Sequence, residues 1–353
     1  MPIAIRSLRN WCGALAALPL CACSTVGYYA HLAHGEAALL AARKPVARVL
    51  ADPAADGRLK ARLQLAQQAR AFASERLALP RNRSYTNYAD LHRAYAMWNV
   101  FAAPEFSLQP FEHCFPIAGC VAYRGYYTRE RADAYAARLR ARGMDTWVGG
   151  VTAYSTLGFF ADPILNTMLR WDDDELAATI FHELAHQRLY VKGDTEFNES
   201  YATFVQREGL SQWRASRGLP PESGRDQARA DEFNQLVMDA RERLQAVYAS
   251  AAPPQQMRER KQAEIARLRA DYVQLRDARW SGDPTYDRWI DGEINNATLL
   301  PFGLYHRWVG AFAALYTKYG SDWAAFHAAA RQLAQLRDEA RTKALLDLQS
   351  AAH

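Results

Sequence analysis

The chain has 353 residues, half of them hydrophobic, and its formal net charge at pH 7 is +5. This length allows one large domain or two modest ones with a sizeable core. The charge is mild and comes from interleaved Arg and Glu in helix-like segments, which argues against a protein that binds nucleic acid.

The N-terminus has the features of a bacterial export signal. Arg6 and Arg9 precede an apolar run that is too short to span a membrane as a helix. Ala22 and Cys23 then end a Leu-Cys-Ala-Cys sequence that resembles a lipobox. We therefore predict a lipoprotein signal peptide at 1–22 and a lipid anchor on Cys23, with a plain cleaved signal as the alternative.

The residues around Cys23 also indicate a destination. Cys21 fits less well as the lipid carrier because Leu20 would precede the cut. Ser24, in place of Asp, resembles lipoproteins that are sent on to the outer membrane. We expect the protein in the cell envelope, on the periplasmic face of the outer membrane.

Helical periodicity dominates the region 23–84. A break at Asp52-Pro53 and a stop at Pro80 predict two or three helices there. From 85 to 127 aromatic and β-favouring residues predict the strands and turns of a small sheet, and a helix is expected over 129–142. The strand-like stretch 147–158 is either a sheet edge that pairs with an extended substrate or an ordinary internal strand.

Cys114 and Cys120 are the other two cysteines of the predicted mature chain. In an exported protein an even pair is a disulfide by default. Closing so short a loop contributes about 2 kcal/mol in the chain-entropy model. Two buried free thiols are the alternative.

Residues 171–187 contain the pattern on which the functional prediction depends. His182 and His186 are four apart, so on a helix both imidazoles can aim at one ion with Glu183 beside it. This is the His-Glu-x-x-His arrangement of zinc peptidases. Zn²⁺ held in this way lowers the pKa of a bound water from about 15.7 towards 7, and Glu183 can move a proton from that water to the leaving amine. Two ordinary core or surface histidines are the alternative.

The helix is expected to begin after Asp172, which can cap the first turn in a capping-box pattern with Glu175, and to stop at Gly193. A second helix should run from Thr195 to a stop at Gly209.

Catalytic zinc sites usually keep three protein ligands. Glu199, in an Asn-Glu-x-x-Ala setting, is the natural third one. Glu196 competes with it, although it lies nearer the start of the second helix. For Glu199 the alternative role is that of a solvated helix glutamate.

The region 211–353 is predicted to be helical. Two apolar stripes separated by Pro253-Pro254 predict an antiparallel hairpin at 225–280, either a structural pair of helices or a wall or lid over the cleft. A zinc peptidase also needs a donor that stabilises the oxyanion. Tyr305 and His306 are the best candidates, with Tyr154 and Tyr190 as weaker ones, and a packed aromatic or a surface histidine is the alternative role.

Several segments together resemble a known family. They are the lipobox, 98–107, 114–126, 153–158, 181–187 and 197–200. They resemble the predicted aminopeptidase family of Gram-negative bacterial lipoproteins over nearly the whole mature chain, which implies a zinc aminopeptidase of the gluzincin type. The Gly-x-Met-x-Asn motif of the gluzincin aminopeptidases is not present. Thr203 stands where thermolysin-like enzymes have an Asp that orients a ligand histidine, so another residue must do this.

We predict an α+β, predominantly helical chain with a zincin-like core at 85–210, a small β-sheet and the long hairpin. The expected activity is that of a zinc-dependent aminopeptidase acting on peptides, and no oligomeric state is predicted. An endopeptidase of the same chemistry and a non-catalytic interaction scaffold are the alternatives. An aminopeptidase must pair the substrate α-amine with a carboxylate, for which Glu105, Asp162 and Glu196 are candidates.

Overall fold

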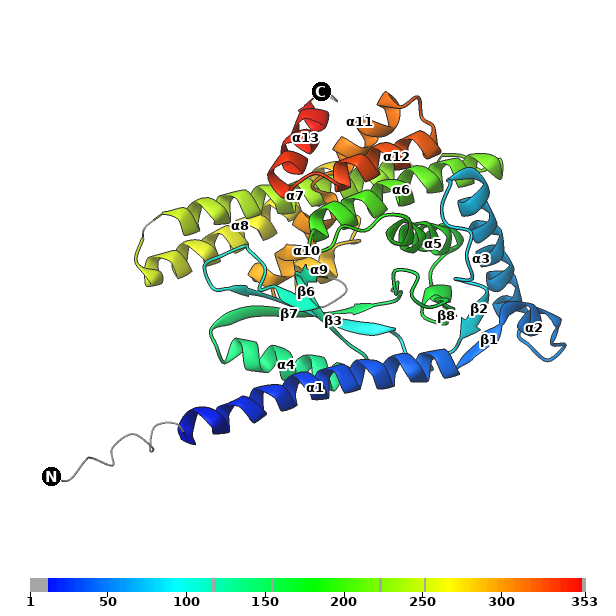
Figure 1. The fold of residues 1–353 in the computed structure, drawn as a ribbon. Coiled ribbons are helices and arrows are strands. Elements are labelled where there is room, and N and C mark those ends of the chain that lie inside the picture. The colour runs from blue at the N-terminus through cyan, green and yellow to red at the C-terminus, as the bar shows by residue number, and fades with distance from the viewer. Residues whose placement is uncertain (1–11, 116–118, 154, 222–223, 251, 351–353) are drawn as a thin grey trace.

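The computed structural model describes residues 12–115, 119–153, 155–221, 224–250 and 252–350, and at 12–24 and 304–306 it describes the backbone alone. Within these ranges the chain is mostly helical, with two three-stranded sheets and a two-stranded hairpin (Figure 1). The predicted class, α+β and predominantly helical, is confirmed.

The central sheet has the strand order β6-β3-β7, from β6 (Tyr123–Tyr126), β3 (Met97–Pro104) and β7 (Met144–Val151), all antiparallel. Because side chains alternate along a strand, β3 has two different buried faces. Val100 and Ala102 pack on α4 (Arg129–Arg140), whereas Phe101 and Ala103 pack on α10 (Asn296–His306). Among the described strands β7 pairs only with β3, so residues 147–151 of the stretch predicted as edge or internal strand form a sheet edge. The described residues that follow, up to 158, are not strand, so that part of the prediction is wrong.

Helix α1 (Cys12–Ala41) runs along the sheet on the same side as α4 (Figure 1). Its second half is held by polar contacts: the Tyr127 backbone N–H donates to Nε2 of His31 at 3.0 Å, and the Tyr127 hydroxyl donates to Oε2 of Glu36 at 2.7 Å. A Cβ on Gly35 would lie 2.1 Å from the Tyr127 ring, so only glycine permits this approach. Within the described ranges, no helix combines the length and the hydropathy needed to cross a membrane.

A second sheet joins the N-terminal helices to the core. It has the order β1-β2-β8, from β1 (Arg43–Pro45), β2 (Asn87–Ala89) and β8 (Ile164–Leu165), followed by a short 3₁₀ turn, η1 (Met168–Arg170). Helix α2 (Val46–Ala51) ends at the predicted break, and α3 (Gly57–Arg76) ends before Pro80. The N-terminal region therefore contains three helices, the upper number that its periodicity predicts.

Helix α5 (Asp173–Arg188) begins as predicted, because the Asp172 carboxylate accepts the Glu175 N–H at 2.8 Å. It ends at Arg188, five residues before the predicted stop at Gly193. The cause is the Asn198 side chain, which binds the N–H of Val191 at 2.7 Å and its C=O at 2.8 Å. These bonds replace the helical bonds that the Val191 backbone would otherwise make.

Helix α6 (Thr195–Ser216) passes through Gly209, so the predicted stop there is wrong. A Cβ on Gly209 would lie 2.7 Å from Cδ1 of Leu77 and 3.1 Å from Cδ2 of Phe181. The glycine thus allows α6 to pack closely on its neighbours, and it does not end the helix. The division expected at 210/211 falls inside this helix.

The main core surrounds α6 and includes α11 (Val309–Lys318), α12 (Trp323–Ala334) and α13 (Asp338–Ser350). Tyr201 of α6 is fully buried against Phe312 and Phe326. Its hydroxyl donates to Nδ1 of His327 at 2.7 Å, while Nε2 of the same imidazole donates to the Leu77 carbonyl at 2.9 Å. Helix α6 is therefore fixed both by aromatic packing and by a buried hydrogen-bond chain.

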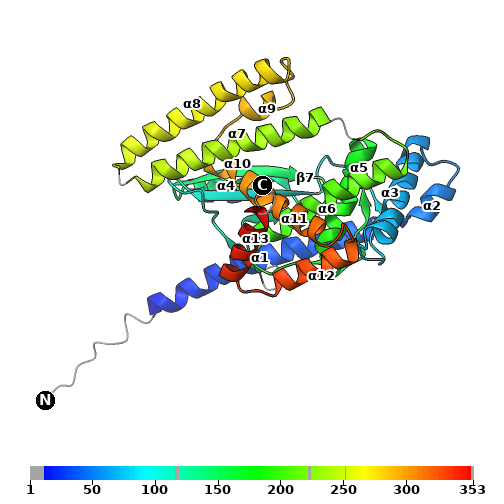
Figure 2. The ribbon, with the colours of Figure 1, turned by 90° about the horizontal axis from the view of Figure 1, so that it is seen from above.

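Helices α7 (Gly224–Ala249) and α8 (Pro254–Arg279) form the predicted hairpin, which lies along one side of the molecule, away from α12 and α13 (Figure 2). Their predicted stripes meet in a core of their own, together with α9 (Asp287–Ile290).

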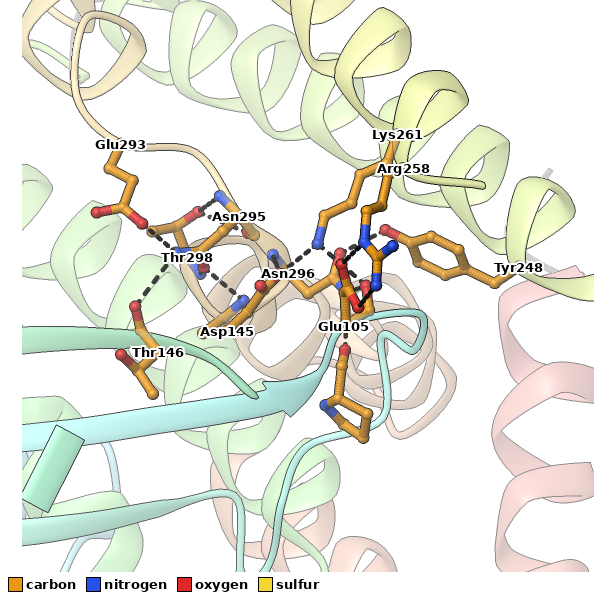
Figure 3. A network of polar contacts seen from close by, with 12 residues as sticks. Glu105, Asp145, Thr146, Tyr248, Arg258, Lys261, Glu293, Asn295, Asn296 and Thr298 are labelled. Atoms are coloured by element: carbon orange, nitrogen blue, oxygen red, sulfur yellow. Dashed lines mark hydrogen bonds and ion pairs between the residues drawn. The ribbon is translucent and has the colours of Figure 1, made fainter. Parts of the chain in front are cut away.

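A buried ion pair joins the hairpin to the central sheet (Figure 3). Lys261 is only 5% exposed, and its ammonium donates to Oδ2 of Asp145 at 2.6 Å and to the Glu105 carbonyl at 3.0 Å. The same carboxylate oxygen of Asp145 accepts the Asn296 N–H at 2.8 Å, at the start of α10. The hairpin is thus fixed to the end of β3, the start of β7 and α10.

Candidate metal centre and active site

Three donor atoms from α5 and α6 converge on one point. Nε2 of His182 and Nε2 of His186 are 3.1 Å apart, and Oε2 of Glu199 lies 3.4 and 3.5 Å from them. Among the described residues these three side chains form the only group of three His, Cys, Asp or Glu whose donor atoms all lie within 4.8 Å of one another. They could therefore hold a metal ion.

Hydrogen bonds made by the residues on either side of Glu199 fix its backbone. Asn198 binds the Val191 backbone, as described above, and the Ser200 hydroxyl accepts the Trp308 N–H at 3.1 Å. Both side chains are buried. Glu199 is held between them, so its carboxylate is directed at the histidines without a long flexible segment.

Gln206 orients the first histidine. Nδ1 of His182 lies 2.9 Å from Oε1 of Gln206, so the ring donates its Nδ1–H there and its Nε2 lone pair faces the other donors. The sequence had left this partner open. Gln206 follows Glu199 by seven residues, which is two turns of one helix, and that spacing is the signal that could have found it.

Replacing Gln206 by Leu should weaken metal binding about 10- to 100-fold, the usual effect of removing such an orienting partner. Competition with a chromophoric chelator measures this affinity. Gln212→Leu is the matched control, since Gln212 lies on the same helix but bonds to Tyr316 and Trp323 instead. Wild-type metal affinity in Gln206→Leu would contradict the assigned role.

Glu183 and Glu199 have opposite electrostatic environments. Burial raises the pKa of Glu183 to about 7, with Glu199 and Asp162 adding to the rise and His182 opposing it. Burial alone would raise the pKa of Glu199 too, but His186 and His182 outweigh it and hold this pKa at about 2. Glu199 thus stays ionised and can act as a metal ligand, whereas Glu183 can accept and return a proton near neutral pH.

The side chains of His182, Glu183, His186 and Glu199 all line a cavity of about 380 Å³ between α5, α6, α1 and the central sheet. Glu183 and Glu199 are the only acidic residues among its described lining residues, and none of these is Lys or Arg. The segment after β7 contributes Ala153 and Ser155, so the free sheet edge leads into the cavity. No residue of the α7–α8 hairpin is among the described lining residues, which favours the interpretation of α7 and α8 as a structural pair of helices.

Three tyrosines line the cavity, and two of them, Tyr123 and Tyr190, lie near Glu199. Burial and the nearby Glu199 raise the pKa of both Tyr123 and Tyr190, so each keeps its proton and can donate it in a hydrogen bond. Tyr190 was a weaker candidate for the oxyanion donor, and Tyr123 was missed. The best candidates, Tyr305 and His306, end α10 with side chains outside the described part, and Tyr154 lies outside the described residues altogether.

The three carboxylates considered for the substrate amine do not line the cavity. Glu105 is paired with Arg258, at 2.6 and 3.0 Å (Figure 3). Glu196, also the competing metal ligand, is partly exposed and lies 2.6 Å from Nη1 of Arg307. Asp162 is buried and accepts from Thr156 and Gln187, at 2.7 and 3.0 Å.

A disulfide joins Cys114 to Cys120 across the hairpin of β4 (His113–Phe115) and β5 (Gly119–Val121). This hairpin forms a wall of the cavity through Phe115 and Val121. Its Gly119, with φ of +79°, lies where a Cβ would come within 2.7 Å of the Gly193 nitrogen. The hairpin therefore packs on the loop between the two helices that carry the donors.

Residues 27–345 match a family model whose description is "Putative aminopeptidase". The chain belongs to this family. The matched range of the aminopeptidase family includes α5, α6 and the part of α1 that lines the cavity, and it places the chain among the peptidases, with peptides as substrates. No curated protein and no solved structure matches the chain.

Proposed function

We propose that this chain is a zinc-dependent aminopeptidase with a zincin-like core, in which His182, His186 and Glu199 hold the metal. The observation that carries the proposal is the triangle of donor atoms, with sides of 3.1, 3.4 and 3.5 Å. Zinc bonds of about 2.0–2.1 Å in a tetrahedron separate the ligand atoms by roughly 3.3 Å, so the donor set fits this ion. With both Nε2 atoms unprotonated, two lone pairs and a carboxylate face one another, an arrangement that a bound cation stabilises.

Zinc in such a site acts as a Lewis acid and lowers the pKa of a coordinated water towards about 7. Glu183 lies in the same cavity and accepts the proton of the attacking water, then returns it to the leaving amine. Tyr123 or Tyr190 donates a hydrogen bond to the oxygen that becomes negative as the peptide carbonyl is attacked.

The charge of the cavity supports action at an amino end rather than a carboxyl end. A carboxypeptidase needs a cation to bind the substrate carboxylate, and no described lining residue is Lys or Arg. A positive α-amine is compatible with two carboxylates and several phenols. An endopeptidase is the second candidate, since Glu105, Asp162 and Glu196 are engaged elsewhere. Apart from Glu183 and Glu199, no described carboxylate lines the cavity to bind the amine.

Peptides with a free N-terminus should be cleaved at the first bond, and their N-acetylated forms should not be cleaved. Mass spectrometry of the products distinguishes the two. Internal cuts in acetylated peptides would support the endopeptidase instead. The same preparation of Glu183→Gln serves as the control for contaminating peptidases.

We also propose that the mature protein is anchored to the membrane by a lipid on Cys23, facing the periplasm. The lipobox-like sequence supports this. Cys23→Ala should abolish lipidation and leave the protein either unprocessed or soluble. Fractionation and mass spectrometry of the N-terminal peptide measure the effect, and an unmodified Cys23 in the wild type would disprove it.

A further inference from the structure

One end of the cavity is apolar and aromatic, unlike the metal centre with its histidines and glutamates. Tyr28 and Leu32 of α1 lie there, with Phe115 from the disulfide hairpin and Met97 from β3. We propose that this end binds a large apolar side chain of the substrate, in the residue next to the cleaved bond, and that α1 forms one wall of this pocket. The inference rests on the proposed function, because it names the substrate class of the same site.

The wall formed by α1 is rigid. The Tyr28 hydroxyl donates to the Gly125 carbonyl at 3.1 Å, and the Arg124 guanidinium lies 3.7 Å from the centre of the Tyr28 ring. The Tyr28 and Phe115 rings are 6.1 Å apart, and Leu32 packs against the same buried cluster. A pocket with fixed walls can select a side chain by size and shape, since few wall side chains must be ordered when the substrate binds.

The charges around the pocket favour an apolar group. Arg124 is not among the lining residues, because its guanidinium also stacks on Tyr135, on the α4 side of the sheet. A Lys, Arg, Asp or Glu side chain of the substrate would therefore enter without a partner at this end, and burying an unpaired charge is costly. An apolar side chain loses no hydrogen bonds to water on entry and gains contact with the side chains of Tyr28, Leu32, Phe115 and Met97.

Gly125 supplies a direct way to test the pocket. It lines the cavity, and a Cβ there would lie 2.9 Å from Cε of Met97 and 3.3 Å from Oδ1 of Asn99. The nearest atom is the far end of a flexible side chain, and Gly125 is not among the glycines with positive φ. Gly125→Val should therefore be tolerated by the backbone and fill the pocket.

The experiment measures kcat/KM of the zinc-loaded full chain for a peptide series with Ala, Leu, Phe, Lys or Asp next to the cleaved bond. The wild type should prefer Leu or Phe to the other three by at least about tenfold. Gly125→Val should lower cleavage of the Phe peptide at least about tenfold and change the Ala peptide by less than about threefold. Leu32→Ala, in the wall formed by α1, should reduce the preference for Leu over Ala.

Leu40→Ala is the matched control, because Leu40 is a partly buried leucine of the same helix that does not line the cavity. It should keep the wild-type ranking. A flat ranking, a preference for Lys or Asp, or an equal loss on all peptides in both Gly125→Val and Leu32→Ala would overturn the proposal.

Binding of the Phe and Lys peptides to Glu183→Gln, measured by calorimetry, separates this inference from the proposed function. Tighter binding of the Phe peptide, weakened when Gly125→Val is added, supports the pocket even if the wild type cleaves nothing, and only the proposed function then fails. Equal binding of the two peptides overturns the pocket even if cleavage is observed.

Discussion

Glu183→Gln should lower turnover by about 10²- to 10⁴-fold, the range typical of losing general acid–base catalysis, while the zinc content and the melting temperature stay near wild type. The amide keeps the size and shape of the carboxylate but cannot accept a proton. The carboxylate is buried, with a pKa raised to about 7, and it lies in the cavity without being one of the three converging donors. Its loss should therefore affect proton transfer and leave the metal bound.

Glu175→Gln is the matched control for this variant. It makes the same chemical change at the other end of α5, at an exposed side chain of the first turn, and should leave turnover unchanged. Equal rates of peptide cleavage by Glu183→Gln and the wild type, with zinc intact in both, would refute Glu183 as the proton acceptor. A wild type that cleaves no peptide would favour the scaffold alternative.

Glu199→Ala should reduce metal affinity by more than the roughly 10- to 100-fold expected for Gln206→Leu, because it removes a ligand rather than an orienting partner. It leaves two imidazoles where the proposed site needs three donors. The remaining cavity would also admit more water near the metal. Metal titration followed by elemental analysis of the protein measures the loss.

Glu196→Ala controls for the charge removed from the start of α6. Glu196 pairs with Arg307 and does not line the cavity, so this variant should bind metal as the wild type does. The reverse outcome, with metal lost in Glu196→Ala and kept in Glu199→Ala, would make Glu196 the third ligand.

The local pattern predicted the helices that carry the site. The spacing of His182 and His186, and the capping of α5 by Asp172, depend only on neighbours in the chain. Where the helices end was less predictable. Helix α5 ends at Arg188 because Asn198 of α6 binds the Val191 backbone, and Gly209 is explained by its close approach to Leu77 and Phe181. Both effects need the two helices to be packed before they exist.

The surroundings of the site depend on contacts between distant residues. Glu105 was a candidate for binding the substrate amine, but the structure pairs it with Arg258, which lies 153 residues later in the sequence. Tyr123 was missed because its position depends on how β6 meets α5 and α6. The role of α1 as a cavity wall was also hidden, since Tyr28 and Leu32 read only as parts of an N-terminal helical region.

The central claim is that His182, His186 and Glu199 hold one zinc ion, and elemental analysis of the purified full-length chain tests it most directly. The account predicts about one zinc per chain in the wild type and none in His182→Ala. Wild-type protein that lacks stoichiometric zinc after incubation with excess zinc, or a folded His182→Ala that retains one zinc per chain, would contradict it.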